Sequence, residues 1–299
     1  MSITKEQIKD AATSLGVDMC GIAGVEIFNS SPEGTHPCDI LPGCKSVIVV
    51  GVRLLDGVVQ ANFRAFEDGR SNLKGIYGTY GYTMLPNFEL TYVCYAVARH
   101  IERNSSAYAT PCSTGPMTNG NQISIRHAAV AAGLGQFGHM SIVLTPDYGP
   151  RVRFGVVLTT LELPQDPMYN GPPLCNPEKC NVCAKVCPTG AISPYGAKEP
   201  EHVAIGDKTY DYPLVNRPKC LKALQAMTKE LGGSGDYLLE AEPTMEDLVE
   251  AERRMPIDAR GLQHITSWNC GRCQAYCPAG NWGERYKAKG LSKGAPSLT

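Results

Sequence analysis

Cysteine spacing gives the clearest indication of chemistry in this chain. Eight of its 13 cysteines fall in the C-terminal half of the 299 residues. Residues 175–188 read C-x4-C-x2-C-x3-C-P, and residues 270–278 read C-x2-C-x3-C-P. Thiolates spaced in this way on tight turns bind neighbouring irons of one cubane, and the last cysteine of each run is carried to the other cluster. The spacing therefore predicts two [4Fe–4S] clusters.

This exchange of ligands assigns the eight thiols to two sets, and the isolated Cys220 completes the count. The first predicted set, quartet A, comprises Cys175, Cys180, Cys183 and Cys277. The second, quartet B, comprises Cys187, Cys220, Cys270 and Cys273. The arrangement is similar to that of a two-cluster ferredoxin, although the first gap is four residues where two are commoner.

Zinc and disulfides are the alternative uses of so many cysteines. Zinc also binds paired C-x2-C motifs, but a four-cysteine zinc site rarely carries the additional x3-Cys-Pro. Disulfides suit small secreted scaffolds, whereas this chain begins MSITKEQIKD, with no apolar signal core and no twin arginine. We therefore expect reduced thiols and a cytoplasmic protein.

Charge and hydropathy limit the classes of partner. The chain has 28 Lys and Arg against 29 Asp and Glu, a net charge of −1, so no basic footprint for nucleic acid or for an anionic membrane stands out. No apolar run approaches the roughly 20 residues that span a bilayer. Neither nucleic acid nor membrane is expected as a partner, and the length allows one large or two modest domains.

Periodicity and turn residues predict the elements that must position the cysteines. A capping box at Thr4 and Gln7 predicts a first helix, and the β-branched run from Ser46 to Val52 predicts a buried strand. Further helices are predicted over residues 87–101, with Asn87 as cap, and 125–132, and further strands over residues 141–145 and 152–159. This alternation predicts an α/β (α+β) fold for the first 160 or so residues.

The composition shifts to Pro, Cys and Asn after Pro164. We therefore predict an α/β domain over residues 1–164, a two-cluster domain over 165–285 and a mobile tail over 286–299. Two helices are expected within the second domain, at Lys219–Leu231 and Thr244–Met255. Cluster ligation replaces much of the hydrophobic core in such a loop-rich module, so it should fold poorly without iron.

Three glycines, Gly133, Gly135 and Gly138, match the dinucleotide fingerprint G-x-G-x-x-G. That motif needs a strand before it and a helix after it, and here the predicted order is reversed. Nicotinamide binding is therefore disfavoured. The glycines instead let the backbone approach a flat ligand closely, or they permit a tight packing turn.

The stretch from Arg126 to Gly155, which contains AGLG and LTPDYGPRVRFG, closely resembles the signature region of cobalamin-dependent reductases, namely epoxyqueuosine reductases and respiratory reductive dehalogenases. Residues 39–51 and 187–192 also resemble sequence of that family. The resemblance covers most of residues 1–285. It implies a nitroreductase-like domain that holds base-off cobalamin beside a ferredoxin-like domain with two [4Fe–4S] clusters.

The resemblance also implies site residues. Arg126 aligns with an arginine near the reacting centre, which makes it our candidate for stabilising charge. The residues expected to bind the cofactor are Gly135, Phe137, Gly138, His139, Ser141, Thr145, Tyr148 and Arg151. Arg151 and Arg153 are expected on one strand face, either as a clamp for corrin carboxamides or a substrate anion, or as a solvated face.

A tyrosine-rich loop over residues 75–82 offers Tyr80 as a candidate proton donor, although such a loop is also typical of ordinary packing. His139, which we place in the glycine loop facing corrin amides, equally suits a simple hydrogen-bonding role. The acidic proton donor of the epoxyqueuosine reductases falls near Asn119 here, and an amide cannot donate a proton as a carboxylic acid does. This departure leaves the substrate open.

These observations predict a cytoplasmic iron–sulfur oxidoreductase that passes electrons from two clusters to a corrinoid, and so reduces a small molecule or a modified base. An external low-potential carrier, a ferredoxin or a flavodoxin, would supply the electrons. One alternative is an electron-transfer protein that reduces the corrinoid of a partner. Another is a reductase that holds flavin in place of cobalamin.

Overall fold

The computed structural model describes residues 3–69, 73–82, 84–112, 123–231, 233, 235–255 and 270–280. The N-terminal part is organised around a four-stranded sheet whose neighbouring strands are all antiparallel. In sheet order the strands are β1 (Met19–Gly24), β2 (Ser46–Arg53), β6 (Val152–Thr159) and β3 (Ala109–Pro111). The expected mixture of helix and sheet is confirmed.

Strand β2 is buried on both of its faces. Val47 and Val49 pack into one hydrophobic cluster, and Ile48 and Val50 pack into another. Successive side chains of a strand point to opposite faces, so a continuous β-branched run suits a strand that is covered on both sides. The strand predicted from Ser46 to Val52 is confirmed, with Arg53 added at its end.

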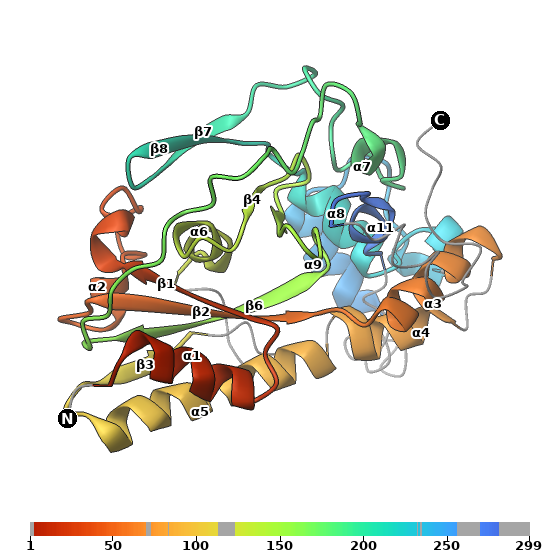
Figure 1. Cartoon of the computed structure of the whole chain (residues 1–299). Helices are drawn as coiled ribbons and strands as arrows, with labels where there is room; N and C mark the ends of the chain where they lie inside the picture. The colour runs from red at the N-terminus through yellow and green to blue at the C-terminus, as the bar shows by residue number, and fades with distance from the viewer. Residues whose placement is uncertain are drawn as a thin grey trace.

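Helices cover both faces of this sheet. Figure 1 shows α1 (Lys5–Ser14) and α5 (Leu85–Asn104) along one face and α6 (Ile125–Ala131) on the other. The capping box of Thr4 and Gln7 begins α1, as predicted. Ser124 caps α6, because its hydroxyl accepts a hydrogen bond from the backbone N–H of His127.

The prediction that Asn87 caps the long helix is wrong, because α5 begins two residues earlier, at Leu85. Pro86 occupies its first turn, where a missing N–H costs nothing. Asn87 is instead buried, and its Oδ1 accepts a hydrogen bond from the guanidinium of Arg153 at 3.0 Å.

Several short elements connect these main ones. Between β1 and β2 lie a 3-10 turn, η1 (Val25–Phe28), and α2 (Pro37–Ile40). Between β2 and α5 lie α3 (Asp56–Glu67), α4 (Lys74–Tyr77) and a π-helical turn, η3 (Gly78–Tyr82). None of the three was predicted, and residues 75–82 were expected to form a loop. The strand predicted over residues 141–145 is reduced to β5 (Val143–Leu144), which pairs with β4 (Gln136–Phe137).

The C-terminal part consists of short helices joined by loops, which gather at one end of the sheet in Figure 1. They are α7 (Val182–Lys185), α8 (Arg217–Leu224), α9 (Met245–Arg254) and α11 (Arg272–Tyr276), with 3-10 turns η4 (Lys229–Leu231) and η5 (Gly235–Tyr237). The helix predicted over residues 219–231 is interrupted, because Ala226 adopts a left-handed backbone with φ +53°. The predicted helix over residues 244–255 is confirmed, with Thr244 as its cap.

A hairpin that the sequence did not predict joins the two parts. Its strands, β7 (Glu201–Ile205) and β8 (Lys208–Tyr212), lie over α6 on the side away from the sheet (Figure 1). Ile205 enters the hydrophobic cluster beneath it. Residues beyond Pro164 therefore contribute to the core of the N-terminal sheet. None of the described helices has the length and apolar composition of a membrane span, and residues 286–299 lie outside the described part of the chain.

Candidate functional site

The four thiols of quartet B line one cavity of about 210 Å³. Cys187 follows α7, Cys220 lies on α8, and Cys270 and Cys273 flank the start of α11. Burial, together with the neighbouring Cys220 and Cys187, raises the pKa of Cys270 to about 12. The structure thus brings together the four cysteines that the sequence assigned to this set.

Quartet A is gathered in the same way from two distant segments. Burial raises the pKa of Cys183 to about 12, and the other three thiols of quartet A act in the same direction. Cys183 and Cys277 are buried in one hydrophobic cluster, with Cys175 packed against it. Cys273 is influenced by the rest of quartet B and also by Cys183, so the two quartets are neighbours.

Both C-x2-C pairs begin a helix with the same backbone feature. Asn181 precedes α7 with φ +49°, and Gly271 precedes α11 with φ +53°. Asparagine and glycine are the residues that adopt this left-handed conformation at least cost. A Cβ at Gly271 would also lie 2.3 Å from the hydroxyl oxygen of Tyr77. The matching turns place each cysteine pair around a helix start.

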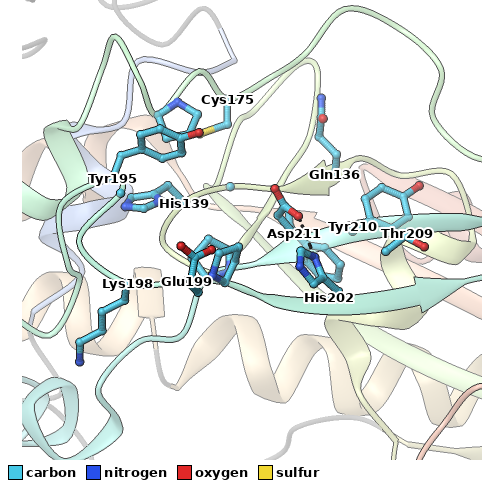
Figure 2. A pocket seen from close by; sticks show the side chains of 16 residues that line it. Gln136, His139, Cys175, Tyr195, Lys198, Glu199, His202, Thr209, Tyr210 and Asp211 are labelled. Carbon is cyan, nitrogen blue, oxygen red and sulfur yellow. Dashed lines mark hydrogen bonds and ion pairs between the residues drawn. The ribbon is translucent and has the colours of Figure 1, made fainter.

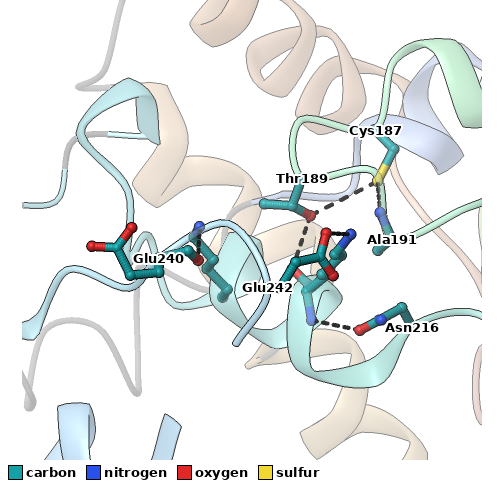
Figure 3. A network of polar contacts seen from close by, with 8 residues as sticks. Cys187, Thr189, Ala191, Asn216, Glu240 and Glu242 are labelled. Carbon is teal, nitrogen blue, oxygen red and sulfur yellow. Dashed lines mark hydrogen bonds and ion pairs between the residues drawn. The ribbon is translucent and has the colours of Figure 1, made fainter. Parts of the chain in front are cut away.

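A polar network fixes Cys187 to the helix that carries Cys220 (Figure 3). The backbone N–H of Ala191 donates to Sγ of Cys187 at 3.2 Å, and the hydroxyl of Thr189 donates to the carbonyl oxygen of Lys219 at 2.8 Å. Asn216 caps α8 by accepting from the N–H of Lys219 at 3.0 Å. These bonds fix the Cys187 thiol and tie its segment to the start of the helix that carries Cys220.

The raised pKa values of these thiols have a chemical consequence. Burial is the largest cause at each shifted member of the quartets, because a thiolate without a counter-charge is costly in an apolar site. A metal cation replaces the proton and removes that cost. Within the described residues, no three or more His, Cys, Asp or Glu side chains are placed to hold a single metal ion. The thiols of a cubane bind different irons and need not converge on one point.

The glycine loop forms a packing turn. A Cβ at Gly135 would lie 2.0 Å from the carbonyl oxygen of Leu144, and one at Gly138 would lie 3.0 Å from the side chain of Leu144. Both glycines are therefore needed for the close approach of β4 and β5. Thr145 lies in the next turn, where its hydroxyl donates to the carbonyl oxygen of Gly149 at 3.2 Å and accepts from the N–H of Tyr148 at 3.2 Å.

Three other predicted cofactor residues lie beneath residues 193–213, which we call the covering segment. The ring of Phe137 meets Tyr212 edge-on at 5.0 Å between centroids, Nε2 of His139 bonds to the carbonyl oxygen of Ser193 at 2.8 Å, and the hydroxyl of Ser141 donates to the carbonyl oxygen of Pro213. A pocket of about 600 Å³ opens between this segment, Phe137 and Cys175. Figure 2 shows His139, Tyr195 and Cys175 together at one side of it, and the ion pair of His202 with Asp211 at the other.

Arg151 requires a correction. Strand β6 begins one residue later, at Val152, and Arg151 is only 1 % exposed, so it belongs to no solvated strand face. Its guanidinium donates to carbonyl oxygens of the segment that follows α11, including that of Cys277 at 2.8 Å. The structure therefore directs Arg151 toward quartet A, and the expected clamp shared with Arg153 is not formed.

The two catalytic candidates are placed differently. The guanidinium of Arg126 donates to the carbonyl oxygen of Ser141 at 2.5 Å, lies over the ring of Tyr212, and borders the quartet B cavity. Tyr80 lies on η3 and is 52 % exposed. Its neighbour Tyr77, to which the sequence assigned no role, is fully buried and donates to Oε1 of Gln274 at 3.0 Å. Asn119 lies outside the described residues.

Comparison with known proteins gives relatives of two kinds, although no family model matches. The chain is 29 % identical over 157 residues to the tetrachloroethene reductive dehalogenase of Sulfurospirillum multivorans, covering 52 % of this chain and 27 % of that protein. It is 31 % identical over 175 residues to that of Desulfitobacterium hafniense, covering 57 % and 28 %. It is 33 % identical over 85 residues to the epoxyqueuosine reductase of Listeria monocytogenes, covering 28 % and 21 %. The match thus spans about a quarter of the length of these proteins.

Solved structures show the same fold over nearly the whole chain. An epoxyqueuosine reductase bound to a modified tRNA stem loop superposes with a TM-score of 0.57 at 18 % identity, covering 93 % of this chain and 65 % of that one. A catabolic reductive dehalogenase gives 0.53 at 18 % identity, covering 88 % and 37 %. The resemblance inferred from the motifs is confirmed: the chain is a relative of the epoxyqueuosine reductases and the reductive dehalogenases, and those relatives are reductases.

Proposed function

We propose that this chain is a cytoplasmic iron–sulfur reductase with two [4Fe–4S] clusters that acts together with cobalamin. The observation that carries the proposal is the convergence of all eight predicted ligands into two adjacent thiol groups, in a fold shared with reductases. An external low-potential carrier, a ferredoxin or a flavodoxin, is the proposed electron donor. The substrate is proposed to be a small molecule or a modified base.

The donor chemistry of the quartets fits iron–sulfur clusters. Each quartet supplies four thiols from buried or half-buried positions, and backbone N–H groups point at the sulfur atoms, as from Ala191 to Cys187. Such hydrogen bonds, together with burial, set the potential of a cluster. Clusters held by the two neighbouring quartets would lie close to each other, and an electron accepted by one could then pass to the other.

The fit to cobalamin is partial. Phe137, Gly138 and His139 border the 600 Å³ pocket, together with Tyr195 and Tyr210 of the covering segment, and these would hold the cofactor. When bound, cobalamin supplies a centre that reduces a substrate with electrons taken from the clusters. Arg126 is proposed to stabilise negative charge that develops on a substrate. Its permanently charged guanidinium borders the quartet B cavity and does not line the 600 Å³ pocket.

A second candidate function is supported by how the other predicted cofactor residues are engaged. Gly135, Thr145 and Arg151 all make close contacts within the protein itself. These contacts favour an electron-transfer protein that reduces the corrinoid of a partner, with the pocket as part of the docking surface.

Anaerobic reconstitution followed by cobalamin titration separates the two. The reductase should contain about eight irons per chain, as two cubanes require, and should retain cobalamin, detected by its absorption. Arg126→Ala should then lose turnover and keep its iron. Arg99→Ala is the matched control, because that arginine lies on α5 over the ring of Tyr95. Full iron without cobalamin retention would favour the electron carrier, and a chain that holds no iron would exclude both.

A further inference from the structure

Arg151 ties the N-terminal half to the segment that links the two quartets. Its Nη1 donates to the carbonyl oxygens of Gln274 at 3.1 Å and Cys277 at 2.8 Å, and its Nη2 donates to that of Ala279 at 2.5 Å. The whole side chain is buried. Three bonds from one planar guanidinium fix the backbone on both sides of a quartet A thiol.

The backbones of the two segments also meet directly. Gly149 has φ +56°, and a Cβ there would lie 2.2 Å from the carbonyl oxygen of Ala279. Gly280 has φ +80°, and a Cβ there would lie 2.1 Å from the backbone nitrogen of Gly149. The side chain of Gln274 donates back to the carbonyl oxygen of Pro150 at 3.1 Å. Both partners are thus shaped for this contact.

The positive charge of Arg151 lies at the contact between residues 149–151 and residues 274–280, next to Cys277 of quartet A. The guanidinium of Arg151 donates to the carbonyl oxygen of Cys277 at 2.8 Å, so its positive charge lies beside this residue. A guanidinium remains charged at every physiological pH. It therefore stabilises negative charge on the Cys277 sulfur and on any group that this sulfur binds.

We propose that Arg151 is a positioning residue that sets the reduction potential of the quartet A cluster. This inference rests on the proposed function, in which quartet A holds a [4Fe–4S] cluster. When the external low-potential donor passes one electron to that cluster, the cluster gains one negative charge. A fixed positive charge and fixed backbone dipoles nearby favour the reduced form, so they raise the potential.

The test compares Arg151 with an arginine two residues away. Arg153 lies on β6, and its guanidinium bonds to Oδ1 of Asn87. Wild type, Arg151→Gln, Arg151→Lys and Arg153→Gln are reconstituted, assayed for iron and titrated under electron paramagnetic resonance. In Arg151→Gln, one cluster should shift to a more negative potential while the other stays in place. Arg151→Lys keeps the charge and should shift that cluster less, and Arg153→Gln should match wild type.

Unchanged potentials in Arg151→Gln at full iron content would overturn the inference, as would an equal shift in Arg153→Gln. If Arg151→Gln fails to hold iron, a second variant that also removes the charge, Arg151→Met, decides: a negative shift confined to one cluster supports the role, and unchanged potentials refute it. A wild-type chain that holds no iron would instead overturn the proposed function, and this inference with it.

Discussion

The sheet region and the cluster region of this protein are held together by different means. In the sheet region, β2 buries alternate side chains in two hydrophobic clusters, and α1, α5 and α6 cover them. In the C-terminal part, which we call the cluster region, the helices are short, the hydrophobic clusters are small, and the thiols of the two quartets lie between the helices. The difference teaches that hydrophobic burial is the main stabilising term in the first region, whereas the proposed clusters would add metal ligation as a second one in the other.

The comparison extends to charge. The thiols of the quartets are neighbours of one another, so each deprotonated thiol raises the pKa of the next. Three arginines oppose this repulsion: Arg126 beside Cys220, Arg272 beside Cys270 and Arg151 beside Cys277. The sheet region needs no such compensation, because its buried side chains are mostly uncharged.

Iron removal should give the largest effect. Chelation leaves repelling, buried thiols without a cation, so α7, α8 and α11 should lose protection from hydrogen exchange almost completely. Amides of β2 and β6 should stay protected, because their hydrophobic clusters contain no metal. Hydrogen exchange with mass spectrometry measures both regions in one sample. Equal loss of protection in the two regions would contradict the distinction.

Substitution of a single cysteine should have the next largest effect, because a cysteine of the quartets and a cysteine of the sheet region should differ in their influence on iron content. Cys273→Ser removes a quartet B ligand, and about four of the eight expected irons should be lost. Cys94→Ser is the control: Cys94 is buried on α5 in the sheet region, so this variant should keep all its iron. Iron and sulfide analysis decides. Full iron content in Cys273→Ser would remove that residue from the ligand set.

A substitution in the hydrophobic core should destabilise the sheet region and leave the iron content unchanged. Ile48→Ala creates a cavity in a fully buried position and should lower the free energy of unfolding of the sheet region by about 2–5 kcal/mol, with the iron content unchanged. The control Val249→Ala lies on the exposed side of α9 and should change it by less than about 0.5 kcal/mol. Urea denaturation of both variants, followed by far-ultraviolet circular dichroism, provides the measurement.

The smallest effect concerns pH. Burial, and then the charge of Arg126, lower the pKa of His127 from 6.5 to about 4. Above pH 6.5 the imidazole is neutral in both states, so it adds no pH dependence. As pH falls from 6.5 toward 4, the unfolded chain takes up the proton first and stability is lost. His127→Gln should flatten the urea midpoint across this window, whereas His100→Gln, on the opposite face of the sheet, should not.

Local signals in the sequence predicted much of this structure. The capping box at Thr4 and the β-branched run of β2 were sufficient, because a cap or a strand depends on residues close together in the chain. The hairpin of β7 and β8 was missed. Its strands are only five residues long, and their inward-facing side chains, such as Val203 and Tyr210, are only partly buried, so the apolar alternation that marks a strand is short and weak.

The sequence by itself determined how the eight cysteines are grouped, since cysteine spacing on two tight turns is a local property. Asn181 and Gly271, each directly after the first cysteine of a C-x2-C pair, were a further local signal of that geometry. Only the tertiary structure decided that Arg151 points to Cys277, which lies 126 residues away, and that residues 193–213 cover Phe137 and Ser141. Contacts between distant segments depend on how the whole chain packs, and no local pattern encodes them.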